Sequence, residues 1–154
     1  MTIKAKIGYT HNGEGLQYKR LMGVDYGDRR VGIALSDPLC IISSAYEVYQ
    51  SKGEDDAISH ISDLVKQFNV SDIAFGLPLN LDGSEGERAL IHKAIGQKLE
   101  QISGAKVHFI DERLTSSEAE DYLKEARIDW KKRKEVIDKI SAQIILQTYM
   151  NSKN

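Results

Sequence analysis

The stretch MGVDYGDRRVGIALSD, residues 22–37, decides how this chain folds. Residues 21–24 are apolar and predict a buried strand that ends at Asp25. The next four residues predict a tight turn, which Gly27 permits because it has no Cβ. Residues 31–35 then return as a second strand. The pattern predicts a β-hairpin that carries a carboxylate where its first strand ends.

A carboxylate at this place is either a divalent-metal ligand or part of a phosphate-binding turn. The alternative is an aspartate that only caps its own turn. Two other acidic positions favour the metal: residues 107–110 form an apolar strand that ends in Asp111 and Glu112, and Asp138 lies in the C-terminal helix. Carboxylates that converge in a fold repel one another unless a cation lies among them. The three positions together therefore indicate a metal site.

The composition is that of a soluble globular protein. The chain has 154 residues, 41% of them hydrophobic and 29% charged, which is enough for one domain with its own core. No apolar run approaches the roughly 20 residues of a membrane span, and the N-terminus lacks the pattern of a signal peptide. A single cysteine, Cys40, excludes an internal disulfide and suits a reducing compartment. We expect a cytoplasmic protein that does not bind membranes.

Basic residues gather in three places, although the net charge is −2. Lys19 and Arg20 precede the first strand, and Arg29 and Arg30 follow Asp25. The longest run precedes the last helix and consists of Lys131, Lys132, Arg133 and Lys134. Four basic residues in a row usually form a solvated helix face, and this alternative stays open. Because all three groups adjoin acidic positions in the sequence, they favour metal-dependent cleavage of a phosphate backbone.

The order of elements predicts an α/β fold. After an N-terminal extension of residues 1–20, which we expect to be loosely ordered, residues 21–154 form a single domain. Beyond the hairpin, the expected elements are a strand at 45–49, a helix at 55–69, a strand at 73–77, a helix at 84–104, the strand at 107–110, a short helix from 115 and a last helix at 134–150. Three strands joined by short turns, followed by alternating helices and strands, predict a central five-stranded mixed sheet flanked by helices.

The helix at 84–104 carries two finer expectations. Ser84 and Glu87 have the spacing of a capping box, which predicts that the helix begins there. Its apolar residues predict an inward face made of Leu90, Ile91, Ala94, Leu99 and Ile102.

Asp138 needs an argument of its own, because it lies inside a helix. It shares a stripe with Ser141 and Ala142, which are small enough for the helix to approach the sheet closely. A carboxylate beside such a stripe costs free energy unless it is neutralised. The alternative to a metal is an ion pair with Arg133 or Lys134, one turn away.

Four segments carry a resemblance to a known family. They are, in order, GVDYGDRRVGIALSD (23–37), GLPLNLDGSEG (76–86), DERLTS (111–116) and IDKISAQIILQTYM (137–150). Each is a weak signal alone, but the four in this order and spacing are specific. The chain resembles the YqgF family, also called RuvX, a branch of the ribonuclease H-like superfamily that includes the RuvC resolvases. It departs from the family's pattern in the turn at Asp28 and Arg29 and in its N-terminal extension.

The resemblance implies a ribonuclease H-like fold and phosphodiester hydrolysis that depends on Mg²⁺, with Mn²⁺ as an alternative, in a bacterial cytoplasm. Members of the family are described as Holliday junction resolvases and, more recently, as nucleases that mature the 5′ end of pre-16S ribosomal RNA. By motif, the resemblance assigns metal binding and catalysis to Asp25, to Asp111 or Glu112, and to Asp138.

An all-carboxylate site suits Mg²⁺, a hard cation that prefers oxygen ligands. The sequence leaves open whether Asp111 or Glu112 is the ligand, because neighbours in a strand face opposite sides of the sheet. Basic side chains near the acids are expected to contact the substrate, and these are Arg29, Arg30, Arg113, Lys131, Lys132, Arg133 and Lys134. Asn80 follows the strand at 73–77 and could line the groove or only form a turn.

Other classes of function stay open to different degrees. The hairpin also resembles the first phosphate loop of actin-like ATPases and sugar kinases, but those enzymes clamp nucleotide between two related domains in a much longer chain. A non-catalytic protein that binds RNA or ribosomal particles stays open, although the complete set of acids argues against it. Within the nuclease class, the family favours a pre-rRNA over a four-way DNA junction. A resolvase needs a stable dimer, whereas an RNA nuclease fits a monomer or weak dimer.

Overall fold

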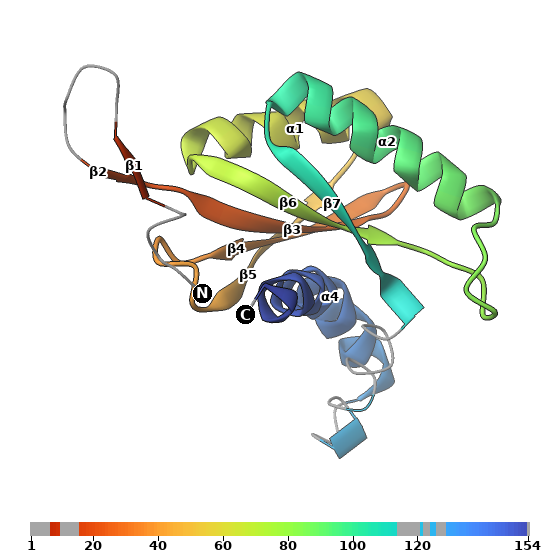
Figure 1. The fold of residues 1–154 in the computed structure, drawn as a ribbon. Coiled ribbons are helices and arrows are strands. Elements are labelled where there is room, and N and C mark those ends of the chain that lie inside the picture. Colours follow the sequence, from red (N-terminus) through yellow and green to blue (C-terminus); the bar gives the residue numbers. More distant parts are fainter. Residues whose placement is uncertain (1–6, 10–15, 114–120, 122–123, 126–128, 154) are drawn as a thin grey trace.

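The computed structural model describes residues 7–9, 16–113, 121, 124–125 and 129–153. Five strands form one sheet, in the order β5-β4-β3-β6-β7 (Figure 1). These strands are β3 (Arg20–Tyr26), β4 (Arg30–Ser36), β5 (Ser43–Gln50), β6 (Val70–Leu77) and β7 (Lys106–Asp111).

Helices cover both faces of this sheet (Figure 1). α1 (Glu54–Gln67) and α2 (Glu87–Ser103) lie together on one face, and α4 (Trp130–Ser152) lies on the other. The chain thus forms three layers, with the sheet between two layers of helices. This arrangement confirms the predicted α/β fold with a central five-stranded mixed sheet.

β3 is the middle strand and is paired on both sides. It pairs antiparallel with β4, with Asp25 opposite Gly32, and parallel with β6, with Val24 beside Phe75. β4 pairs antiparallel with β5, and β6 pairs parallel with β7. Antiparallel neighbours need only a short turn, whereas parallel neighbours need a crossover, which α2 supplies between β6 and β7. The predicted hairpin is confirmed.

Alternate residues of β3 face the two helical layers. Met22 and Val24 are fully buried in the core under α1 and α2. Gly23 faces the opposite layer, where a Cβ would overlap the carbonyl oxygen of Ala142 in α4. The predicted close approach of α4 to the sheet is therefore confirmed. Asp25 lies two residues beyond Gly23 and faces the same layer.

Two expectations for α2 are wrong. The helix begins at Glu87, and the Ser84 hydroxyl donates to the Asp82 carboxylate in the preceding loop (2.6 Å) instead of capping the helix. The buried residues of α2 are Ala89, His92, Ile95, Gly96 and Leu99, and only the last of them was expected. The buried face is shifted because α2 packs on β7 through Gly96, where a Cβ would overlap the ring of Phe109.

The N-terminal extension contributes a short antiparallel pair, β1 (Ile7–Tyr9) and β2 (Leu16–Tyr18). The rest of the extension before residue 16 and the start of the short helix expected from residue 115 lie outside the described residues. The last helix begins at Trp130, earlier than expected. Among the described helices, none is long and apolar enough to cross a membrane.

Candidate metal centre

Asp25 and Glu112 come together where three neighbouring strands end. Asp25 is near the end of β3, and Glu112 directly follows the last residue of β7. β6 lies between these two strands, and a Cβ at its Gly76 would overlap the Glu112 carboxylate. Because Gly76 has no side chain, Glu112 can lie over β6 and reach Asp25.

Beside Asp25, the Glu112 side chain favours its protonated form. Burial, then the negative charge of Asp25 and a hydrogen bond with it, raise the pKa of Glu112 from 4.5 to about 8. The positive charge of Arg88 opposes this rise. Two carboxylates this close cannot both ionise without repulsion, so either a proton or a cation must lie between them.

Asp111 does not join this pair, although it is next to Glu112 in the sequence. Its carboxylate accepts two hydrogen bonds from Nε of Arg113 (both 3.0 Å) and one from Nη2 (2.7 Å). The Arg113 side chain holds the pKa of Asp111 below its usual range. The structure thus brings Glu112, and not Asp111, beside Asp25.

The third predicted acid, Asp138, lies on α4, and its side chain is outside the described residues. Its backbone is one helical turn before Ala142, the residue of α4 that lies against Gly23. Within the described part of the chain, no three His, Cys, Asp or Glu side chains gather as a metal site. Asp25 and Glu112 supply two carboxylates, and the remaining ligands of a metal ion would have to come from other groups.

Apart from Arg113, the predicted basic residues divide into three groups. Arg29 and Arg30 are exposed and lie at the hairpin turn, at the same end of the sheet as Asp25. Lys132 is exposed and Arg133 half-buried at the start of α4. The side chains of the run's other two members are outside the described residues, and these are Lys131 and Lys134. A contact between any of these residues and a substrate stays a prediction.

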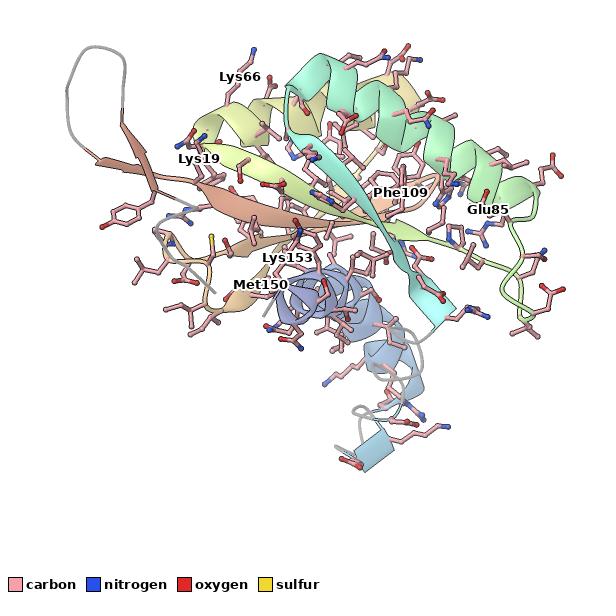
Figure 2. All side chains as sticks on the ribbon, in the orientation of Figure 1. Lys19, Lys66, Glu85, Phe109, Met150 and Lys153 are labelled. Carbon is pink, nitrogen blue, oxygen red and sulfur yellow. The ribbon has the colours of Figure 1, made fainter. Side chains whose placement is uncertain are left out.

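Lys19 and Arg20 do not adjoin the acids, which corrects the expectation from the sequence. Arg20 begins β3 and Asp25 is near its end, so the two are roughly 17 Å apart along an extended strand. The Arg20 guanidinium lies over the ring of Phe68, 5.4 Å from its centroid, at the end of α1. Figure 2 shows Lys19 at the opposite end of the sheet from Glu85, which precedes α2.

Asn80 has the turn role that the sequence left open. Its backbone N–H donates to the Ser84 carbonyl and its side-chain amide to the Ser84 hydroxyl, both at 3.0 Å. Its carbonyl accepts from the N–H of Gly83 (2.9 Å). Asn80 therefore organises the loop between β6 and α2, and its contact with a substrate stays a prediction.

Sequence reasoning missed three residues around the pair. Gly76 makes room for Glu112, and its place at the head of the segment GLPLNLDGSEG is the signal that could have shown it. Arg88 is exposed in the first turn of α2 and acts on Glu112 through its charge. His92 is buried edge-on against Tyr26 (5.5 Å between centroids), and burial, helped by Arg88, lowers the pKa of His92.

Comparisons with known proteins agree with this architecture. A family model described as RuvX, Holliday junction resolvase, matches residues 19–152. A relative from Dictyoglomus thermophilum, named "Putative pre-16S rRNA nuclease", is 42% identical over 135 residues, which are 88% of this chain and 97% of the relative. A relative of the same name from Lacticaseibacillus casei is 43% identical over 137 residues, 87% of this chain and 95% of the relative.

A solved structure shares the fold. T. thermophilus RuvC in complex with a Holliday junction substrate matches with a TM-score of 0.55 at 9% sequence identity. The match covers 86% of this chain and 96% of that chain. At this identity the likeness concerns the fold alone, which is the α/β fold of the RuvC resolvases.

Proposed function

Because the chain belongs to the RuvX family, we propose that it is a metal-dependent nuclease that hydrolyses phosphodiester bonds, with a pre-16S ribosomal RNA as substrate. The name of its relatives supports the substrate, and the pairing of Asp25 with Glu112 supports the chemistry. That pair is the observation on which the proposal rests, because two adjacent carboxylates repel unless a proton or a cation lies between them, and a divalent cation can take the place of the proton.

The residues fit a divalent cation with oxygen ligands. Asp25 and Glu112 would hold it together with Asp138 of α4, and the all-carboxylate set suits Mg²⁺, with Mn²⁺ as the alternative. Asp111 is left out because its carboxylate is occupied by Arg113. Its contribution is indirect, since it holds Arg113 beside the Glu112 backbone.

The chain's own residues prepare the reaction. When bound, a divalent cation lowers the pKa of an attacking water and stabilises the charge that develops on the phosphate. Asp25 keeps its position because β3 is hydrogen-bonded on both sides. Arg29 and Arg30, with the basic run 131–134, would neutralise the phosphates on either side of the bond that is cut.

The proposal extends to location and partners. The chain has a single cysteine, Cys40, and so forms no internal disulfide, which supports a cytoplasmic protein. A precursor RNA would reach it there within ribosomal particles. Cutting a single RNA strand requires only one active site, so we propose that the protein is a monomer or weak dimer.

The test compares two substrates at matched salt. The purified protein is incubated with Mg²⁺ and either a precursor 16S rRNA fragment or a four-way DNA junction, each labelled at its 5′ end. We expect the RNA to be cut with Mg²⁺, and bound but hardly cut with Ca²⁺, which tolerates looser coordination. Paired nicks in the junction with intact RNA would favour the resolvase named in the family's description. Binding of RNA without cleavage of either substrate would favour a non-catalytic binding protein.

A further inference from the structure

Leu81 projects into solvent from the loop between β6 and α2. This residue is 97% exposed, whereas the next most exposed large hydrophobic residue of the described chain, Ile42, is 62% exposed. An aliphatic side chain in water loses the free energy that burial would give it. Leu81 therefore contributes no core packing that would explain its presence.

The local backbone does not require a leucine either. The Gly83 N–H donates to the Asn80 carbonyl (2.9 Å), so Leu81 occupies the second position of a β-turn. Proline and polar residues are favoured in turns because they fix the backbone or bond to it, and leucine does neither. Leu81 is thus an apolar side chain placed at the apex of a tight turn.

The turn is held firmly by its own side chains. Asp82 accepts from the backbone N–H of Ser84 (2.9 Å) and from its hydroxyl (2.6 Å). Asn80 donates to Ser84 from its backbone and from its side chain. Gly83 adopts a φ of +89°, which a residue with a side chain rarely adopts. The position of Leu81 is therefore fixed by the loop.

The same loop is tied to the carboxylate pair. Nη1 of Arg113 donates to the Leu81 carbonyl (3.1 Å), while the other guanidinium nitrogens bind Asp111. Arg113 directly follows Glu112, so one residue connects the apex of the turn with the acid that lies beside Asp25. The loop also lies at the end of the sheet where β6 and β7 end (Figures 1 and 2).

We propose that Leu81 is a nucleobase wedge, which inserts against a base beside the cleaved phosphate and unstacks it from its neighbour. The proposal rests on the proposed function, because it needs a nucleic acid at the carboxylate pair. Base faces are the apolar part of a nucleic acid, and apolar side chains of nucleic-acid-binding proteins insert between base steps in this way. Because Arg113 links the Leu81 turn to Glu112, the base that Leu81 contacts determines which phosphate lies over Asp25 and Glu112.

The test follows base stacking directly. A synthetic single-stranded RNA with 2-aminopurine at one position near the cut is mixed with the protein in Ca²⁺, so that binding proceeds without turnover. We expect the wild-type protein to raise the fluorescence at one or two positions, and Leu81→Ala to lose that rise. With Mg²⁺, Leu81→Ala should cut roughly tenfold more slowly, the effect of losing one base contact. Leu81→Met, which keeps an apolar side chain, should restore both signals.

Ile42→Ala is the matched control, because it also removes an exposed aliphatic side chain, in the loop before β5. It should match the wild type in fluorescence and rate, and all variants should melt at the same temperature. Normal fluorescence and rate in Leu81→Ala, with an active wild type, would overturn the wedge and leave the nuclease standing. A fluorescence rise that depends on Leu81 without any cleavage would support the wedge and overturn the nuclease. If the protein binds no RNA and cuts no junction, the wedge is wrong as well.

Discussion

Replacing Glu112 by glutamine should stabilise the metal-free protein at alkaline pH. In the folded state the pKa of Glu112 is raised to about 8 from 4.5, so the fold prefers the protonated acid. The free energy that protonated Glu112 contributes to folding is complete below about pH 4.5. It is lost as the pH rises toward about 8, because in this range Glu112 is ionised in the unfolded chain but still protonated in the folded protein. Glutamine stays neutral throughout and escapes this loss.

The size of the stabilisation by Glu112→Gln follows from the pKa of Glu112. At about 1.4 kcal/mol per pKa unit, the rise from 4.5 to about 8 sets an upper bound of roughly 5 kcal/mol. Asp25 and Glu112 are only half-buried, and solvent screening should reduce the effect to roughly 2 kcal/mol. For a domain of this size that corresponds to about 4–8 °C in melting temperature.

The assay is thermal melting in EDTA at about pH 5 and about pH 9, on either side of most of this titration. Glu112→Gln should melt close to the wild type at the acidic pH and clearly above it at the alkaline pH. Glu87→Gln, the same change at an exposed carboxylate in α2, should follow the wild type. Added Mg²⁺ should close the gap at alkaline pH by stabilising the wild type. A parallel loss of stability in the wild type and Glu112→Gln between the two pH values would show that the pKa of Glu112 is not raised by the fold.

Three further predictions follow from the same geometry. Binding of Mg²⁺ below about pH 8 should release about one proton, because the cation replaces the proton on Glu112. Calorimetry in buffers of different ionisation enthalpy measures this release, and a heat of Mg²⁺ binding that is the same in every buffer would contradict it. Gly76→Ala should displace the Glu112 carboxylate, so the affinity for Mg²⁺ should fall by roughly tenfold or more. The circular dichroism spectrum should be unchanged, and an unchanged affinity for Mg²⁺ would contradict the role of Gly76. Reversing the charges of Lys132 and Arg133 should flatten the salt dependence of RNA binding by about 0.7 log unit per lost phosphate contact, and an unchanged slope would show a solvated helix start.

The sequence predicts those parts of the fold that depend on local patterns. The hairpin around Asp25 is correctly predicted because apolar runs and a glycine turn leave few alternatives over so short a distance. The buried face of α2 is not, because Leu90 and Ile91 are apolar and yet exposed, while His92 and Gly96 are buried. Which face is buried depends on Phe109, a residue of another element, and periodicity within the helix does not contain that information.

The candidate site shows the same division. The sequence predicts Asp25 and the two neighbouring acids at the end of β7 as site residues. Alternation cannot choose between Asp111 and Glu112, because the chain leaves β7 and becomes helical at residue 112. The choice depends on Gly76 in a third segment, whose missing side chain makes room for Glu112. Likewise Lys19, close to the hairpin in sequence, is separated from the acids by the length of β3.

The most direct measurement of the central claim is the rate of Mg²⁺-dependent cleavage of a precursor 16S rRNA fragment by two neighbouring variants. Glu112→Gln removes half of the described carboxylate pair, and Asp111→Asn removes the partner of Arg113 and leaves the pair in place. Loss of a metal ligand costs several kcal/mol of transition-state stabilisation, so Glu112→Gln should be slower by roughly 100-fold or more. Asp111→Asn should stay within about tenfold of the wild type, as for loss of an exposed ion pair. Full activity in Glu112→Gln, or the larger loss in Asp111→Asn, would contradict the account.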